Sequence, residues 1–107
     1  MTRGSKKELG DWGEKQAIDF LVRHGYFIKE QNYQIRGAEI DIIAKNPNGR
    51  FGETLCFVEV KTRSSHFGSA ERATDWQKIL HIKKAAKFYC ITNCIDDCVP
   101  ISFEQVS

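Results

Sequence analysis

The chain has 107 residues, 41% of them hydrophobic and 28% charged, and a formal net charge of +2. This length and composition predict one small globular domain that spans residues 1–107. No apolar run approaches the ~20 residues of a membrane span, and the basic start lacks the apolar stretch of a signal peptide, so we expect a cytoplasmic protein with no membrane partner.

The first predicted element is a helix that begins at residues 5–8, which match the S-x-x-E capping box, or near Leu9, and ends at Arg23 or His24 before a stop at Gly25. Within this helix, Glu14 lies beside the apolar stripe that begins with Ala17. A carboxylate on the core side of a helix needs a partner. Two interpretations stay open, a salt bridge at the border of the core and a contact with a metal ion or basic group on the sheet.

Three strands are expected next, because β-branched and aromatic residues recur there with turn residues between them. The predicted strands cover residues 26–35, 37–44 and 56–63, and the turn before the last strand covers residues 46–52. The second and third strands therefore form a β-hairpin.

This hairpin has a predicted register. If its loop is symmetric about Arg50, Asp41 lies opposite Glu59, with Cβ atoms roughly 5 Å apart. Alternation along the strand puts Asp41 on one face and both Ile40 and Ile42 on the other.

Two directly opposed carboxylates repel each other, so the pairing of Asp41 with Glu59 needs an explanation. A divalent cation removes the conflict, because Mg²⁺ is held by one or two carboxylates. Lys61, two residues after Glu59 on the same face, would stand beside whatever the metal binds. The alternative is a lattice of cross-strand salt bridges on a solvated sheet face.

The excess of positive charge lies in residues 61–87, where seven Lys or Arg residues face only Glu71 and Asp75. A basic surface beside a metal site favours a polyanionic substrate, because phosphate contacts release counterions. The same charges also fit the solvated face of a second helix, which is predicted from Thr74. A final strand is predicted over residues 99–103.

The order helix, three strands, helix, strand predicts the fold class. It indicates an α/β (α+β) sandwich, in which a mixed sheet of four to five strands has a helix on each face. No repeat, linker or low-complexity segment interrupts this order.

Several motifs carry a resemblance to a known family: Gly13-Glu14, the run Glu-Ile-Asp-Ile-Ile-Ala at residues 39–44, and the run Phe-Val-Glu-Val-Lys-Thr-Arg at residues 57–63. Together they resemble the YraN-like family of uncharacterised bacterial proteins over residues 9–103. More widely, Asp41 followed by Glu59-Val60-Lys61 resembles the PD-(D/E)XK nuclease superfamily. The resemblance implies a restriction-endonuclease-like core.

The resemblance also implies roles for single residues. Asp41 and Glu59 would ligate Mg²⁺ or Mn²⁺ directly, with the Val60 carbonyl as a third oxygen ligand. Glu14 would join them directly or through water, and Lys61 would orient the attacking water or neutralise developing charge.

Four further residues are expected to contact nucleic acid. Arg63 ends the third strand and Ser64 begins the polar loop that follows it, a position from which both can reach phosphate. Gln77 and Lys78 open the second helix, and the resemblance implies that residues at these positions approach the bound phosphate.

The sequence departs from the family pattern at Ala38, where the family usually has a second glycine. Alanine gives up the freedom of glycine at positive φ, which leaves the direction of Glu39 open. Glu104 replaces an aspartate that the family usually has near the end.

The four cysteines, Cys56, Cys90, Cys94 and Cys98, lack the CxxC spacing of zinc sites. We expect small buried thiols that stay reduced in the cytosol. Some nucleases of the superfamily hold an iron–sulfur cluster on four cysteines, which is the alternative interpretation.

The first functional expectation is a magnesium-dependent nuclease that hydrolyses phosphodiester bonds in DNA. Superfamily members that resolve branched DNA share this compact plan and act as two-fold dimers, so the resemblance favours junction DNA as substrate and a homodimer. A second interpretation is a module that binds nucleic acid without cutting it, which the change at Ala38 favours. A third is an interaction domain with no role in nucleic-acid binding.

Overall fold

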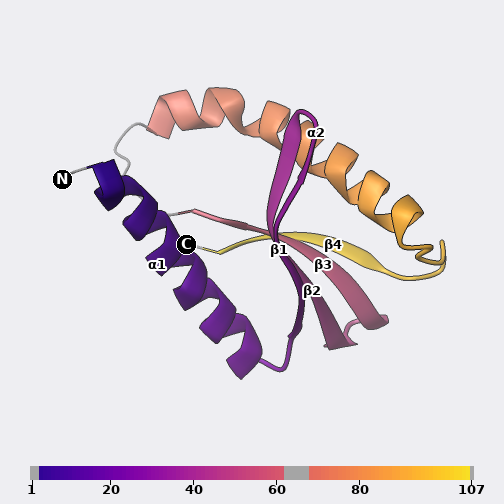
Figure 1. The fold of residues 1–107 in the computed structure, drawn as a ribbon. Helices are drawn as coiled ribbons and strands as arrows, with labels where there is room; N and C mark the ends of the chain where they lie inside the picture. The colour runs from indigo at the N-terminus through magenta and orange to yellow at the C-terminus, as the bar shows by residue number, and fades with distance from the viewer. Residues whose placement is uncertain (1–2, 62–67, 107) are drawn as a thin grey trace.

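The computed structural model describes the backbone of residues 3–61 and 68–106 and the side chains of residues 12–61 and 76–106. Within these residues, two helices and four strands follow one another in the order that the sequence predicted (Figure 1). They are α1 (Arg3–Arg23), β1 (Phe27–Ile35), β2 (Ala38–Gly49), β3 (Gly52–Val60), α2 (Gly68–Thr92) and β4 (Ile101–Val106). The predicted α+β class is confirmed.

Helix α1 begins slightly before the predicted capping box and ends where the sequence predicted. Gly25 has a φ of 89°, in the left-handed region that glycine favours. The Gly25 N–H donates to the Val22 carbonyl and the Tyr26 N–H to the Leu21 carbonyl, each at 3.0 Å. This pair of bonds is a Schellman motif, which satisfies the last carbonyls of the helix and directs the chain into β1.

The strands form one mixed sheet in the order β1-β2-β3-β4. The pairs β1–β2 and β2–β3 are antiparallel, whereas β3 and β4 are parallel and α2 makes the crossover between them. Strand β4 begins later than predicted, at Ile101. Pro100 has no N–H for a ladder, but its carbonyl accepts the Leu55 N–H at 2.9 Å and so leads the chain into the sheet.

The β2–β3 hairpin has the predicted register but a different loop. Partners such as Ile42 with Val58 and Asn46 with Thr54 match the predicted pairing. The turn itself is shorter than predicted, because Gly49 pairs with Gly52 and only two residues lie between them. A bulge in β2 between Asn46 and Gly49 takes up the extra residue and restores the register below it.

Each helix covers one face of the sheet (Figure 1). The core on the α1 side consists of Ala17, Leu21, Ile42, Ala44, Cys56 and Val58. The core on the α2 side consists of Ile40, Ile43, Leu55, Phe57, Ala85, Ala86 and Tyr89. In the part of the chain that is described, no helix is long and apolar enough to cross a membrane.

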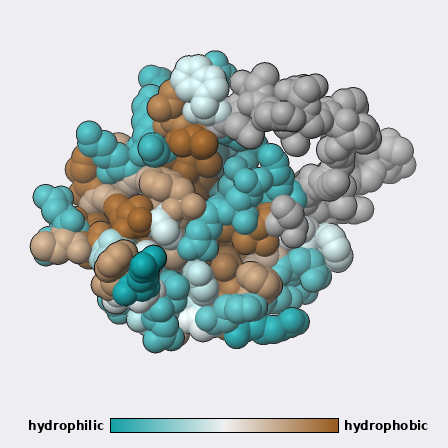
Figure 2. Space-filling view, turned by 180° about the vertical axis from the view of Figure 1, so that it is seen from behind, coloured by the Kyte–Doolittle hydropathy of each residue, from teal (hydrophilic) through white to brown (hydrophobic). Residues whose placement is uncertain are grey.

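Some large apolar side chains lie outside these two cores. Ile101 and Phe103 on β4 are each 45% exposed, and Trp76 and Leu80 on α2 are exposed by more than half. Figure 2, the view from behind, shows hydrophobic patches bordered by polar residues. The homodimer implied by the resemblance stays a prediction. These exposed apolar side chains could form contacts in such a dimer.

Candidate functional site

The two central strands separate at Asp41. Pairing between β2 and β3 ends with Ile42 opposite Val58, whereas β2 stays paired with β1 as far as Ala38. Beyond the last β2–β3 pair, the Asp41 carboxylate takes the place of a strand carbonyl and accepts the Val60 N–H at 2.8 Å. The Asp41 side chain is therefore held in the gap where β2 leaves β3.

The separation changes the faces that β2 presents. Ile40 packs in the core on the α2 side and Ile42 in the core on the α1 side, so the prediction that they share a face was wrong. Strict alternation assumes a strand that stays paired along its length, and β2 twists as it leaves β3 between these residues. On β3 the side chains do alternate, since Leu55 and Phe57 lie on the α2 side and Cys56 on the α1 side.

Asp41 and Glu59 lie close enough to influence each other. One more step along the hairpin register puts them on opposite strands at the same level. Burial raises the pKa of the Asp41 carboxyl, the Val60 N–H lowers it, and the negative charges of Glu39 and Glu59 raise it further. A nearby positive charge therefore stabilises the ionised form, and Lys78 supplies one.

Lys78 reaches across from α2 to the predicted metal ligand Glu59. Its Nζ lies 2.5 Å from a Glu59 carboxylate oxygen, and the two side chains are 51% and 18% exposed. Glu59 shares the α2 side of β3 with Phe57, which explains why a residue of that helix meets it. Lys78, which was predicted to contact the phosphate of a nucleic acid, thus contacts a carboxylate of the pair in this structure.

Glu14 and Lys61, the other predicted catalytic residues, are both half-buried. Glu14 lies on α1, one turn before Ala17 of the core on the α1 side. The Lys61 N–H donates to the Val106 carbonyl at 2.8 Å, so the main chain at Lys61 is fixed to the end of β4.

The acids predicted to bind the metal do not form a group of three. Among residues 12–61 and 76–106, no three His, Cys, Asp or Glu side chains lie together as a metal site requires. The structure brings Asp41 and Glu59 to one place, which leaves the pair and not a trio of carboxylates as the candidate centre.

The residues predicted to contact nucleic acid divide into two groups. Gln77 and Lys78 are exposed on α2, and Lys78 faces the carboxylates through its ion pair with Glu59. Arg63 and Ser64 lie outside the described residues.

The four cysteines differ in their surroundings. Cys56 is buried on β3, and burial raises the pKa of its thiol to about 11. Cys90 is half-buried, but Cys94 and Cys98 are exposed, so the prediction of buried thiols is wrong for these two. They follow the end of α2 in the segment that leads to β4.

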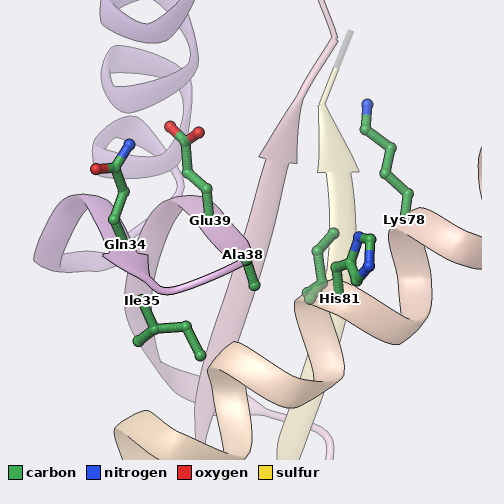
Figure 3. A pocket seen from close by; sticks show the side chains of 8 residues that line it. Gln34, Ile35, Ala38, Glu39, Lys78 and His81 are labelled. Carbon is green, nitrogen blue, oxygen red and sulfur yellow. The ribbon is translucent and has the colours of Figure 1, made fainter.

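A pocket of about 480 Å³ lies between the β1–β2 turn and α2 (Figure 3), and its lining residue Lys78 pairs with Glu59. Its lining comes from the β1–β2 turn and from α2 and comprises Gln34, Ile35, Gly37, Ala38, Glu39, Lys78, His81 and Ile82. Gln34 and His81 were not among the predicted site residues. The signal that could have found them is weak: His81 lies one helical turn after Lys78, and Gln34 precedes a tight turn.

One family model matches a stretch of the chain that includes all the predicted catalytic residues. The model of the family described as "Uncharacterised protein family UPF0102" matches residues 13–106. A UPF0102 protein of Caldicellulosiruptor bescii is 42% identical over 101 residues, which cover 94% of this chain and 81% of that protein.

Two further relatives have the same description. A UPF0102 protein of Geobacter metallireducens is 47% identical over 81 residues, which cover 75% of this chain and 62% of that protein. One from Clostridium botulinum is 37% identical over 101 residues, which cover 94% of this chain and 78% of that protein. The resemblance to the YraN-like family is confirmed at this level, and the placement in the nuclease superfamily stays a prediction.

Proposed function

We propose that this chain, which belongs to the UPF0102 family, is a magnesium-dependent nuclease that hydrolyses phosphodiester bonds in DNA. Manganese would serve as an alternative ion. Branched DNA, with four-way junctions first, is the substrate class that the sequence resemblance favours.

The observation that carries the proposal is the position of Asp41 beside Glu59 where β2 and β3 separate. The Val60 N–H holds the Asp41 carboxylate at 2.8 Å, and Lys61 follows Val60 on the same stretch of chain. Two carboxylates and a lysine at one end of a hairpin are groups that metal-assisted phosphodiester hydrolysis uses.

The donor groups fit a magnesium ion. Mg²⁺ prefers oxygen ligands and needs only one or two carboxylates, because waters complete its shell. Asp41 and Glu59 would hold it, with the Val60 carbonyl as a further oxygen and Glu14 acting through water. The ion pair of Glu59 with Lys78 supports the proposal, because it shows that the carboxylate of Glu59 binds a positively charged group. When bound, magnesium would stabilise charge on the phosphate and make a water molecule more acidic.

The basic and polar residues would position the substrate. Lys61 would orient the attacking water or neutralise the charge that develops on the phosphate. Lys78 would hold a phosphate from the side of α2. Contacts to the neighbouring phosphates would come from Gln77, Arg63 and Ser64.

The variants Asp41→Asn and Lys61→Ala test the proposal. Asparagine keeps an acceptor for the Val60 N–H but removes the charge that holds a cation, and alanine removes the ammonium. We expect each substitution to lower the cleavage rate by a factor of roughly 10²–10⁴. Gel assays on labelled linear, flapped and junction DNAs with Mg²⁺ or Mn²⁺ measure this. The exposed residues Asp19 and Lys29 provide the matched controls Asp19→Asn and Lys29→Ala, which should cut like the wild type. Equal cleavage by all four variants would contradict the assignment.

A module that binds nucleic acid without cutting it is the second candidate. Two observations favour it, namely the ion pair that already engages Glu59 and the absence of a third acid from the group among the described side chains. The same panel of DNAs separates the two functions. Binding without cleavage in either metal, by the wild type, would favour this candidate over the nuclease.

A further inference from the structure

The pocket beside the carboxylate pair is connected to the proposed active site through Lys78. This residue lines the pocket, and its ammonium also pairs with Glu59. A volume of about 480 Å³ falls within the ~300–1,000 Å³ of small-molecule sites. A group bound in the pocket would therefore lie next to the bond that the nuclease cuts.

The floor of the pocket is apolar and fixed in position. Ile35, Ala38 and Ile82 line it, and all three pack against the core on the α2 side. Ile35 and Ala38 also pair with each other across the turn between β1 and β2. A flat group such as a nucleobase can lie on this floor without rearrangement of the core.

The two walls of the pocket have opposite electrostatic character. Gln34 and Glu39 extend from the β1–β2 side, whereas Lys78 and His81 extend from α2 (Figure 3). A nucleotide has the complementary polarity, because its phosphate is anionic and its base edge carries N–H donors. The wall with Lys78 attracts the phosphate, and the wall with Glu39 repels it and can accept from a base amino group.

We infer that this pocket is a subsite for one unpaired nucleotide of the DNA, with its phosphate toward Lys78 and His81 and its base edge toward Gln34 and Glu39. The inference rests on the proposed function and changes its first substrate from four-way junctions, whose arms are fully paired, to DNA with an unpaired nucleotide. A base inside a continuous duplex is stacked and paired, so it cannot enter such a pocket without being extruded. DNA with an unpaired nucleotide beside the cut bond is therefore the preferred substrate.

Binding without cleavage tests the subsite. In EDTA, fluorescence anisotropy would compare a labelled duplex that carries one bulged nucleotide with the same duplex fully paired. We expect the wild type to bind the bulged duplex about tenfold more tightly, and His81→Ala and Gln34→Ala each to reduce that preference about three- to tenfold, the range of one lost hydrogen bond.

The chain offers matched controls for both variants. His24 is exposed on the turn after α1 and Gln31 is exposed on β1, and neither lines the pocket. The variants His24→Ala and Gln31→Ala should keep the wild-type preference for the bulged duplex. A loss of preference in the pocket variants alone would support the subsite.

Two other outcomes are distinguishable. If the wild type binds both duplexes equally, or if the pocket variants behave like their controls, the inferred subsite is contradicted. The proposed cleavage at Asp41 and Glu59 is not contradicted by that result. If the wild type neither cuts DNA nor binds either duplex, the proposed function fails and the subsite fails with it.

Discussion

Asp41 serves the fold and the proposed chemistry with the same carboxylate. It accepts the Val60 N–H at the point where β2 leaves β3, and it lies among the charges of Glu39, Glu59 and Lys78. A hydrogen bond from a backbone N–H favours the ionised form, but burial and the two neighbouring glutamates oppose it more strongly. A site with this imbalance gains stability when a cation binds, which is the property that a metal centre needs.

The raised pKa of Asp41 predicts a pH-dependent effect of Asp41→Asn. Because the pKa is raised above the ordinary 3.8, the folded state binds the proton more tightly than the unfolded chain, and ionisation destabilises the fold. The wild type therefore loses stability as pH rises from 3.8 through the raised pKa, and the loss persists at pH 7. We expect Asp41→Asn to melt at a higher temperature than the wild type at pH 7 in EDTA.

The difference should shrink below pH 3.8, where Asp41 is protonated in both states. Thermal unfolding followed by circular dichroism measures it. Asp19→Asn, at an exposed position on α1, is the control and should melt like the wild type at both pH values. A lower melting temperature of Asp41→Asn at pH 7 would mean that the stronger hydrogen bond of the charged Asp41 carboxylate with the Val60 N–H outweighs the cost of burying its charge.

The β2–β3 hairpin decides whether Asp41 and Glu59 meet. Its register depends on two compensating features, a two-residue turn and a bulge in β2 between Asn46 and Gly49. Pro47 lies in this irregular stretch, where a residue without an N–H is tolerated. A one-residue change in either feature would move every side chain of one strand to the other face.

Gly49→Ala should destabilise this hairpin. A Cβ atom at Gly49 would lie 2.2 Å from Thr54 Oγ1 and 2.7 Å from the Gly52 carbonyl oxygen. The Thr54 side chain can rotate, but the backbone carbonyl cannot move without altering the turn. We expect the free energy of unfolding in urea to fall by about 1–3 kcal/mol, as for other overpacked positions.

The neighbouring Asn48→Ala is the control for that measurement. The backbone N–H of Asn48 donates to the Asn46 side chain at 3.0 Å, and alanine keeps this N–H. Its effect should stay within about 0.5 kcal/mol, as for most surface substitutions. A Gly49→Ala protein as stable as the control would show that the turn relaxes around the added methyl group.

At the scale of the whole molecule, α2 carries several lysines, and one of them, Lys78, contacts the carboxylate pair. The chain has a net charge of only +2, but Lys78, Lys83, Lys84 and Lys87 all lie on this helix. Because α2 covers the face that carries Glu59, its turn with Lys78 lies next to the proposed active site. A polyanion that binds along α2 would be guided to Asp41 and Glu59.

This arrangement predicts salt-dependent DNA binding. The logarithm of the affinity should fall linearly with the logarithm of the salt concentration, and Lys78→Ala should reduce the slope by about 1, as expected for one phosphate contact. Anisotropy titrations at salt concentrations between about 50 and 200 mM, where DNA affinity changes strongly with salt, would measure this slope. Affinity that does not change with salt would instead favour an interaction domain with no role in nucleic-acid binding.

Local sequence signals were sufficient for the order of the elements and for part of the site. The Schellman stop at Gly25, the turn residues around Arg50 and the alternation on β3 are short-range features, so they predicted the helix end and the pairing of Ile42 with Val58. That register in turn placed Asp41 opposite Glu59. The compensation between the bulge and the turn was not predicted, although the register that results from it was.

By itself, the sequence determined the α+β order, the hairpin register and the identity of the two opposed carboxylates, because each depends on residues close together in the chain or on a regular period. Only the tertiary structure decided that β2 leaves β3 at Asp41, that Lys78 meets Glu59, and that Gln34 and His81 line one pocket. These contacts join segments that are far apart in the sequence. Their geometry depends on how α2 packs on a twisted sheet, and no local pattern encodes that packing angle.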